Sequence, residues 1–220
     1  MNFVKALRED PERQAFVIKV YGIVAAQLSV SVIGTGYVLS SEDAQEWMKD
    51  HIYLHFVAIV VGIALLCAIH CCKNNARIVP RNYILLGLFT ICWSYMVAGF
   101  AGQFEPEIVF MAAALTFAMF IGLTLFACFC KMRMTVLWGI AAAGTIAVWP
   151  MIIFFWIFPS KAFYNVLCFF IVILTSIYII FDTKLIMGYL SVDEYIIGAL
   201  ILYVDIVQLF IYLLSLLGNN

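Results

Sequence analysis

The fold of this chain is decided by residues 163–217, which contain two apolar runs: FYNVLCFFIVILTSIYIIFDTKLIMG over 163–188 and VDEYIIGALILYVDIVQLFIYLLSLL over 192–217. Each run is long enough for a membrane-spanning helix, which needs about 20 apolar residues. Three residues separate the runs, so we expect a hairpin of antiparallel helices. Each run holds one aspartate deep in its apolar stretch, Asp182 and Asp205. An ionised carboxylate there costs about 2.5–3.5 kcal/mol on insertion scales, so such residues pair with a partner or line a pathway.

The composition of the whole chain extends this interpretation from two helices to seven. Of the 220 residues, 66% are hydrophobic and 11% are charged, whereas soluble domains contain about 25% charged residues. Apolar runs of spanning length occur over residues 16–39, 54–72, 83–102, 108–130, 135–158, 163–188 and 192–217. The sequence therefore predicts an all-α membrane protein, with an N-terminal segment at 1–15, one seven-transmembrane-helix bundle at 16–217 and a short tail at 218–220.

Lysine and arginine are distributed unevenly between alternating loops. The N-terminal segment and the loops at 73–81 and 131–133 contain eight of them, whereas the other three loops contain two, Lys49 and Lys161. Because basic residues accumulate on the cytoplasmic side of a membrane, we predict a cytoplasmic N-terminus. Seven full spans place the C-terminus on the opposite side, whereas a re-entrant last segment would return it to the cytoplasm.

The last helix is predicted to carry a polar stripe. Ser191 and Glu194 have the spacing of a capping box, which starts a helix sharply. Steps of four and three residues then define one helical face, which contains Glu194, Gly198, Ile201, Asp205, Gln208, Tyr212 and Ser215. This face either lines a hydrated cavity or packs against the bundle with Asp205 as a hydrogen-bonded structural residue. The first interpretation makes Glu194 and Gln208 candidate pore-lining residues.

The chemistry of the two aspartates depends on whether they touch. Counting residues from the cap leaves Asp182 and Asp205 offset in depth by up to about 10 Å, so the sequence leaves their contact open. In contact, two carboxylates in a low-dielectric site cannot both ionise cheaply and they share a proton. The protonated pair would hold two helices together, and the deprotonated pair would repel itself and offer oxygen ligands to calcium. This predicts a pH-sensitive cation gate, with Asp182 and Asp205 as transient ligands of a cation such as calcium.

Four stretches of the chain resemble the transmembrane BAX-inhibitor-motif family, in particular its lifeguard branch. They are RQAFVIKVY at 13–21 with Gln27-Leu28, VPRNY at 79–83 running into Phe89-Thr90, FDT at 181–183, and DEY at 193–195 continuing through LYVDI at 202–206 to Leu209-Phe210. They occur in the order expected for the family over nearly the whole chain, and the last two are specific.

The resemblance implies a seven-helix bundle whose last helix is central and surrounded by the other six. It also implies calcium leak across endoplasmic-reticulum, Golgi or plasma membranes, suppression of cell death, and a pH-sensing pair at Asp182 and Asp205. A latch arginine is expected near the cytoplasmic end of the second helix. Arg77 and Arg81 lie just beyond that helix, and Arg77 is the better candidate. Gln208 stands where the family usually has asparagine.

Other classes of protein fit the sequence less well. An intramembrane aspartyl protease usually has a Gly-x-Gly-Asp element, whereas Asp205 follows Leu202-Tyr203-Val204. His51 and His55 share a helical face by spacing, but His70 lies about four turns away, so three histidines cannot converge on zinc. The last run has no lysine for a retinal Schiff base.

The sequence therefore predicts no enzymatic activity, no cofactor and no nucleic-acid partner; its environment is the lipid bilayer. The main rival to a calcium leak channel is a non-conducting regulator of cell survival. Such a protein would act by binding other membrane proteins of cell-death or calcium-handling pathways. Asp182 and Asp205 would then only stabilise the fold.

Overall fold

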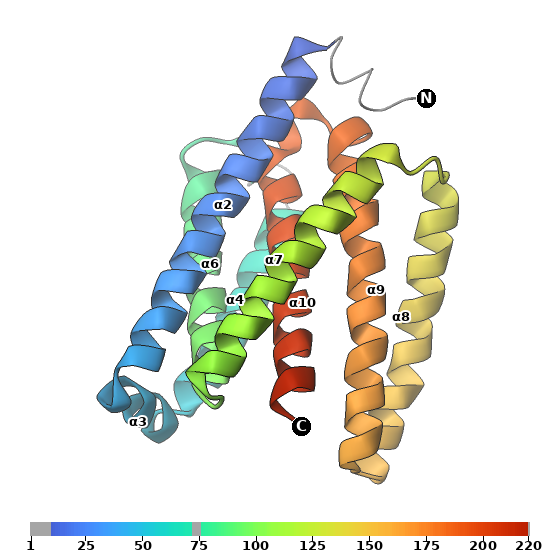
Figure 1. Cartoon of the computed structure of the whole chain (residues 1–220). Coiled ribbons are helices and arrows are strands. Elements are labelled where there is room, and N and C mark those ends of the chain that lie inside the picture. Colours follow the sequence, from blue (N-terminus) through green and yellow to red (C-terminus); the bar gives the residue numbers. More distant parts are fainter. Residues whose placement is uncertain (1–9, 72–75, 220) are drawn as a thin grey trace. The chain divides into compact units, whose positions relative to one another are not determined.

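The computed structural model describes residues 10–71 and 76–219, whose helices are drawn in Figure 1. Within these residues the regular structure is helical, without a strand. In chain order the helices are α2 (Pro11–Ser40), α3 (Glu42–Asp50), α4 (Tyr53–Cys71), α6 (Arg81–Ala101), α7 (Pro106–Phe129), α8 (Met134–Ile157), α9 (Lys161–Gly188), the 3-10 turn η1 (Val192–Glu194) and α10 (Tyr195–Gly218).

Seven of the described helices are long and apolar enough to cross a membrane when η1 and α10 are counted together. From α4 onward, each of these begins and ends within two residues of its predicted apolar run. The predicted all-α membrane fold is confirmed. Helix α2 begins at Pro11, earlier than its apolar run, because proline suits the first helical position and the acidic Glu12 suits the positive end of the helix dipole. Residues 1–9 and 72–75, part of the predicted N-terminal segment and basic loop, lie outside the described residues.

The chain divides into two compact units. The first, the N-terminal unit, consists of Glu12–Pro106 and Leu190–Tyr203. Within it, α4 packs against α6. The second, the C-terminal unit, contains Glu107–Tyr189 and Val204–Asn220, and here α8 packs against α9. Helix α10 contributes its first nine residues to the N-terminal unit and the rest to the C-terminal unit.

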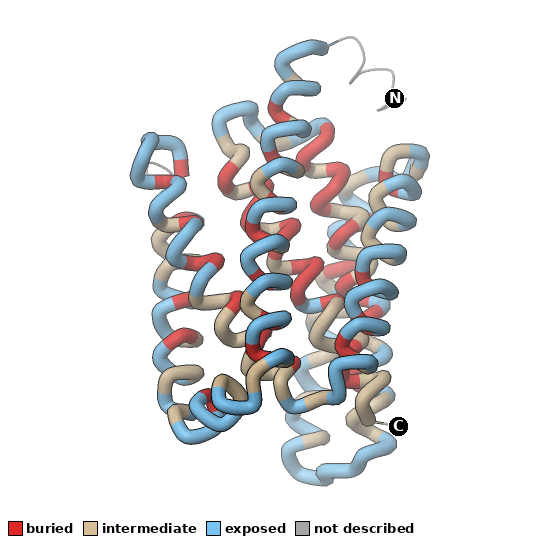
Figure 2. Tube along the Cα trace, turned by 60° about the vertical axis from the view of Figure 1, so that its left-hand side comes forward, coloured by how far each residue is buried: buried red, intermediate tan, exposed pale blue. Residues whose placement is uncertain are grey.

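Burial differs strongly between the spanning helices. Half of the most apolar window is buried in α9 and in the η1–α10 span, against 11–39% in the other five. Figure 2 shows the pattern in α2, which follows the N-terminus: most of the helix is exposed or half-buried, and buried residues recur every three or four positions. A helix buried on many sides has few lipid-facing positions, so its polar groups can be kept inside the protein. Helix α10 has this property, as expected of a central last helix, and α9 shares it.

A short helix, α3, occupies the segment that the sequence left as a loop. The Ser41 side chain caps it by accepting from the Ala44 N–H (3.3 Å), and Glu42 and Asp43 stand in its first turn. Helix α3 ends at Asp50, before α4 begins, so His51 is its C-cap and His55 lies on another helix. The predicted shared face of the two histidines is therefore wrong. The described residues contain no cluster of three or more metal-ligating side chains.

Candidate gating site in the last two helices

The turn between α9 and α10 is fixed by local hydrogen bonds. Helix α9 ends where the Tyr189 N–H donates to the Leu185 carbonyl. Ser191 and Glu194 then form the predicted capping box: the Ser191 side chain accepts from the Glu194 N–H, and the Glu194 carboxylate accepts from the Ser191 N–H (3.4 Å). The first turn after the cap is the 3-10 turn η1 rather than α-helix. The sequence signal for the start of the last helix is thus confirmed.

The C-terminal unit brings Asp182 and Asp205 together. Apolar residues of α9, Val172 and Ile179, pack in one cluster with Leu209 of α10, so these stretches of the two helices are neighbours. Within this arrangement the carboxyl groups of Asp182 and Asp205 lie close enough to interact through a side-chain hydrogen bond. The contact that the sequence left open is therefore made, despite the depth offset inferred from residue counts. A hydrogen bond between two carboxyl groups needs a proton on one of them, because a carboxylate without a proton is only an acceptor.

Both aspartates are buried, 9% and 8% exposed respectively. The Oδ2 atom of Asp205 is buried and has no hydrogen-bond partner among the described residues. An unpartnered buried carboxyl oxygen is costly, by about 1–3 kcal/mol or more for a charged group. Burial of Asp205 Oδ2 is therefore favourable only when a proton or a cation offsets its charge.

The two candidate latch arginines lie in the N-terminal unit. The Arg77 guanidinium donates to the Glu194 carboxylate at 2.9 Å, and the two side chains are 43% and 18% exposed. Arg77 thus pairs with the acidic residue of the capping box. Arg81 is the exposed first residue of α6.

The predicted polar stripe is not uniform in its surroundings. Gln208, three residues after Asp205, is exposed, whereas Ser215 is buried and its hydroxyl bonds the Ile211 carbonyl (2.9 Å). Tyr164 of α9 also donates to Ser215 (3.4 Å). Glu194, at the start of the stripe, is engaged with Arg77. The stripe therefore contains one buried ionisable group, Asp205, with an exposed amide one turn further on.

Lys184, two residues after Asp182, is buried, although the sequence predicts that its side chain reaches the membrane surface. By its place near a helix end, Lys184 would extend toward the membrane surface. In the structure it is 1% exposed, and its Nζ donates to the Met132 carbonyl at 2.8 Å, in the loop between α7 and α8. Its burial was not evident from the sequence because the acceptor is a backbone carbonyl, which any residue carries.

A second polar cluster, in the N-terminal unit, was also missed by the sequence reasoning. The buried hydroxyl of Tyr203 lies 2.8 Å from the Ser31 hydroxyl, which lies 2.9 Å from that of Ser94. One turn away, the Gln27 amide donates to the Thr90 hydroxyl (2.9 Å). The signal was present: polar residues recur every four positions at Gln27 and Ser31 of α2 and at Thr90 and Ser94 of α6.

Comparison with known proteins places this architecture in a family. Residues 13–220 match the sequence profile of the family described as inhibitor of apoptosis-promoting Bax1. The chain belongs to this family. Among its relatives, human protein lifeguard 3 is 27% identical over 94% of this chain and 70% of the human protein. Bax inhibitor 1 of Schizosaccharomyces pombe is 31% identical over 94% of this chain and 77% of the yeast protein. The family resemblance predicted from the four stretches is confirmed, and this Bax-inhibitor family member is a multi-pass membrane protein.

Proposed function

We propose that this Bax-inhibitor family protein is a pH-sensitive calcium leak channel whose gate is the pair Asp182 and Asp205. The observation that carries the proposal is the hydrogen bond between two buried carboxyl groups on neighbouring spanning helices. Carboxyl groups at membrane depth are expensive and mark ion or proton pathways. Calcium prefers oxygen ligands, which carboxylates supply.

The gate works through the proton that the two carboxyl groups share. With the proton bound, the hydrogen bond joins α9 and α10 and the pair carries at most one negative charge. Loss of the proton leaves two carboxylates side by side, which repel each other and attract a divalent cation. The unpartnered Oδ2 of Asp205 is available to such a cation, and the exposed Gln208 amide, one turn away on α10, provides a further oxygen.

The wider role follows from the names of the relatives, and it is part of the same proposal. A family described as inhibitors of apoptosis-promoting Bax1 suggests suppression of cell death. We further propose that the leak acts in the endoplasmic reticulum, the Golgi or the plasma membrane. The distribution of basic residues supports a cytoplasmic N-terminus. Other membrane proteins of cell-death or calcium-handling pathways are the proposed partners.

The test is calcium flux into proteoliposomes between about pH 5 and pH 8. Wild type is compared with Asp182→Asn, Asp205→Asn and the double variant, because an amide imitates the size and neutrality of a protonated carboxyl group. We expect each variant to hold, at every pH, the flux that wild type shows at the acidic end. Asp193→Asn is the matched control, since Asp193 is an exposed acid in η1, and it should keep the wild-type pH profile.

One outcome separates the channel from the rival regulator. If folded wild-type protein gives no flux above empty liposomes at any pH, the protein does not conduct. The hydrogen bond between Asp182 and Asp205 would then serve the stability of the fold, and cell survival would depend on protein partners.

A further inference from the structure

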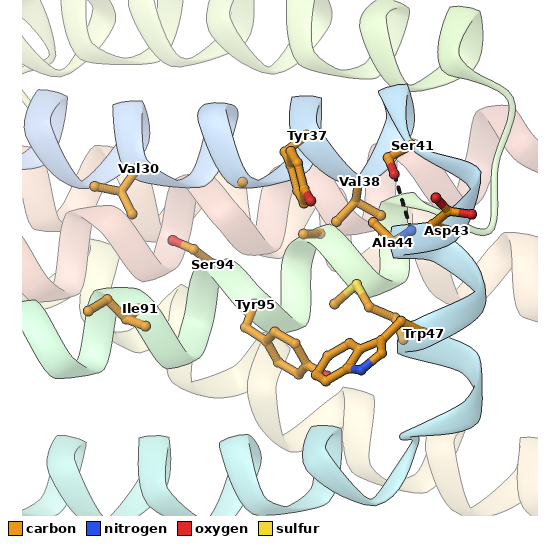
Figure 3. A pocket seen from close by; sticks show the side chains of 13 residues that line it. Val30, Tyr37, Val38, Ser41, Asp43, Ala44, Trp47, Ile91, Ser94 and Tyr95 are labelled. Carbon is orange, nitrogen blue, oxygen red and sulfur yellow. Dashed lines mark hydrogen bonds between the residues drawn. The ribbon is translucent and has the colours of Figure 1, made fainter.

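Two hollows of the structure differ in their relation to the helices that carry the aspartate pair. The larger, about 580 Å³, lies in the N-terminal unit, and Figure 3 shows its walls on α2, α3 and α6. Within the described part of the chain, none of its lining residues belongs to α9 or α10. The smaller, about 400 Å³, lies in the C-terminal unit, at the start of α9 and the end of α10. Its lining residues are Phe155, Pro159, Ser160, Lys161, Tyr164 and Asn219.

The smaller hollow lies at the end of the α9–α10 hairpin that is remote from its turn. In the predicted topology this end faces the side of the membrane opposite the cytoplasm. Asn219 follows Asp205 by fourteen residues, or about 21 Å of helix. This is more than half of the roughly 30 Å hydrocarbon core. An ion that passes between the hollow and the aspartate pair therefore needs polar groups over most of the bilayer.

One face of α10 supplies polar groups over this distance. At steps of three and four residues, which keep to one face of a helix, Asp205 is followed by Gln208, Tyr212, Ser215 and Asn219. All residues of α10 are described, and Gln208 is the only exposed one. Polar side chains at membrane depth face the protein interior or a water-filled cavity. An exposed amide on this helix therefore indicates a hydrated opening beside Asp205.

Tyr164 joins the hollow to this face of α10. Its side chain lines the hollow, and its hydroxyl donates to the Ser215 hydroxyl at 3.4 Å. The Cys168 thiol, one turn further along α9, lies close enough to the Tyr164 hydroxyl to interact with it. Ser215 is 2% exposed, so the polar groups are continuous from the hollow into the helix pair but are packed closed. This closed packing is consistent with the hydrogen-bonded, closed form of the proposed gate.

Lys161 places a positive charge in the lining of the hollow. It is the first residue of α9, it is exposed, and the other lining residues are uncharged. A fixed positive charge lowers the local concentration of cations. The effect is larger for a divalent ion than for a monovalent one, because the interaction energy scales with the charge of the ion. Lys161 therefore opposes the entry of calcium into this hollow without closing it.

We propose that the hollow is the mouth of the calcium path on the side opposite the cytoplasm, and that Lys161 limits the entry of calcium there. This inference rests on the proposed leak function and names a route for its ion. The route runs from Lys161 past Tyr164 and Ser215 to Gln208 and the aspartate pair. Lys161 sets the rate of entry, and the pair sets the pH dependence.

The charge is tested by calcium flux of the full chain in proteoliposomes, at the alkaline end of the pH range used for the gate. Flux should rise from wild type through Lys161→Gln to Lys161→Glu, several-fold in total, whereas Lys161→Arg should match wild type. High ionic strength should reduce these differences, because salt screens exposed charges. Lys49→Glu is the matched control. Lys49 is the other basic residue of the loops predicted on this side, but it lies on α3 in the N-terminal unit, and its substitution should leave flux unchanged.

A second measurement locates the mouth without altering Lys161. Asn219→Cys is treated with a cationic or an anionic methanethiosulfonate reagent, which attaches a charge of either sign to the lining of the hollow. The cationic reagent should lower calcium flux and the anionic reagent should raise it. Gln103→Cys is the matched control, since Gln103 is an exposed amide in the loop between α6 and α7, on the same predicted side. Treated wild type, with its seven native cysteines, gives the background.

The failure of this inference is distinguishable from the failure of the leak itself. Absence of wild-type flux at every pH would refute the leak and the mouth together. If wild-type flux depends on pH but responds neither to Lys161→Glu nor to the reagents at Asn219→Cys, calcium enters elsewhere and the mouth is wrong. Equal effects of Lys161→Glu and Lys49→Glu would show a general effect of surface charge and would also overturn the mouth.

Discussion

Two polar clusters on one helix, α10, illustrate opposite ways of placing polar groups inside a membrane protein. Tyr203 joins Ser31 and Ser94 in a cluster of neutral hydroxyl groups that bond one another in the N-terminal unit. Asp205, two residues later, joins Asp182 in the C-terminal unit and keeps one buried oxygen unbonded. The hydroxyl cluster holds no group that titrates near neutral pH. In the proposed mechanism the carboxyl pair exchanges a proton, so only the second cluster is expected to respond to pH.

The largest expected effect is a difference between the two clusters in how their substitutions change the pH dependence of calcium flux. Tyr203→Phe should leave calcium flux in proteoliposomes as pH-dependent as in wild type, because it removes a neutral hydroxyl group. Asp205→Asn should abolish that dependence, because it removes the shared proton. The measurement is the ratio of flux at about pH 8 to flux at about pH 5 for each protein. A flat profile for Tyr203→Phe would contradict the division of roles between the clusters.

In the C-terminal unit, loss of the buried charge of Lys184 should lower the stability of the fold more than loss of an exposed charge. Lys184→Met should lower the free energy of unfolding by about 1.5–3 kcal/mol, since the hydrogen bond from the buried ammonium group to the Met132 carbonyl is lost. Lys161→Met, at the exposed start of the same helix, is the control and should change it little. Denaturant unfolding in detergent micelles measures both. Equal effects of the two substitutions would mean that the Lys184 hydrogen bond contributes nothing specific.

The hydroxyl cluster should contribute a smaller, pH-independent amount of stability. Tyr203→Phe should lower the free energy of unfolding by about 0.6–1.7 kcal/mol, the range for interhelical hydrogen bonds in membranes. Tyr37→Phe is the control because Tyr37 is 67% exposed. The same loss should be found at about pH 5 and about pH 8, as neither hydroxyl partner ionises there. A loss that grows with pH would show that the cluster is coupled to an ionisable group.

The smallest expected effect concerns Arg77 and tests the latch implied by the family resemblance. Arg77→Gln and Glu194→Gln should each lower stability by about 0–1 kcal/mol, because the ion pair is partly exposed. A double-mutant cycle of unfolding free energies measures their coupling, which added salt should weaken. Glutamine at 194 keeps the capping box. If Arg77→Gln changes calcium flux and Glu194→Gln does not, Arg77 acts on the gate rather than on the turn.

The sequence by itself determined the properties that sum along the chain. Hydropathy located the seven spans to within a few residues, because the cost of inserting a helix into a bilayer adds residue by residue. The capping box at Ser191 and Glu194 could be predicted from the sequence because its two partners lie three residues apart. The two aspartates stood out since a charge in an apolar run is costly wherever the helix packs. The short helix α3 also has a local sequence signal, Ser41 followed by two acidic residues. A hydropathy profile does not detect it, because the signal lies in capping and not in apolar length.

Only the tertiary structure decided which side chains meet. Residue counting left Asp182 and Asp205 at different depths, yet their carboxyl groups are hydrogen-bonded. Arg77 pairs with Glu194, which lies far from it in sequence. Lys184 donates to the backbone carbonyl of Met132, and because every residue has such a carbonyl, the sequence does not identify the acceptor. These contacts depend on the tilt and rotation of helices, which are set by packing against neighbours rather than by apolar length. Side-chain partners, unlike spans, are therefore properties of the folded bundle.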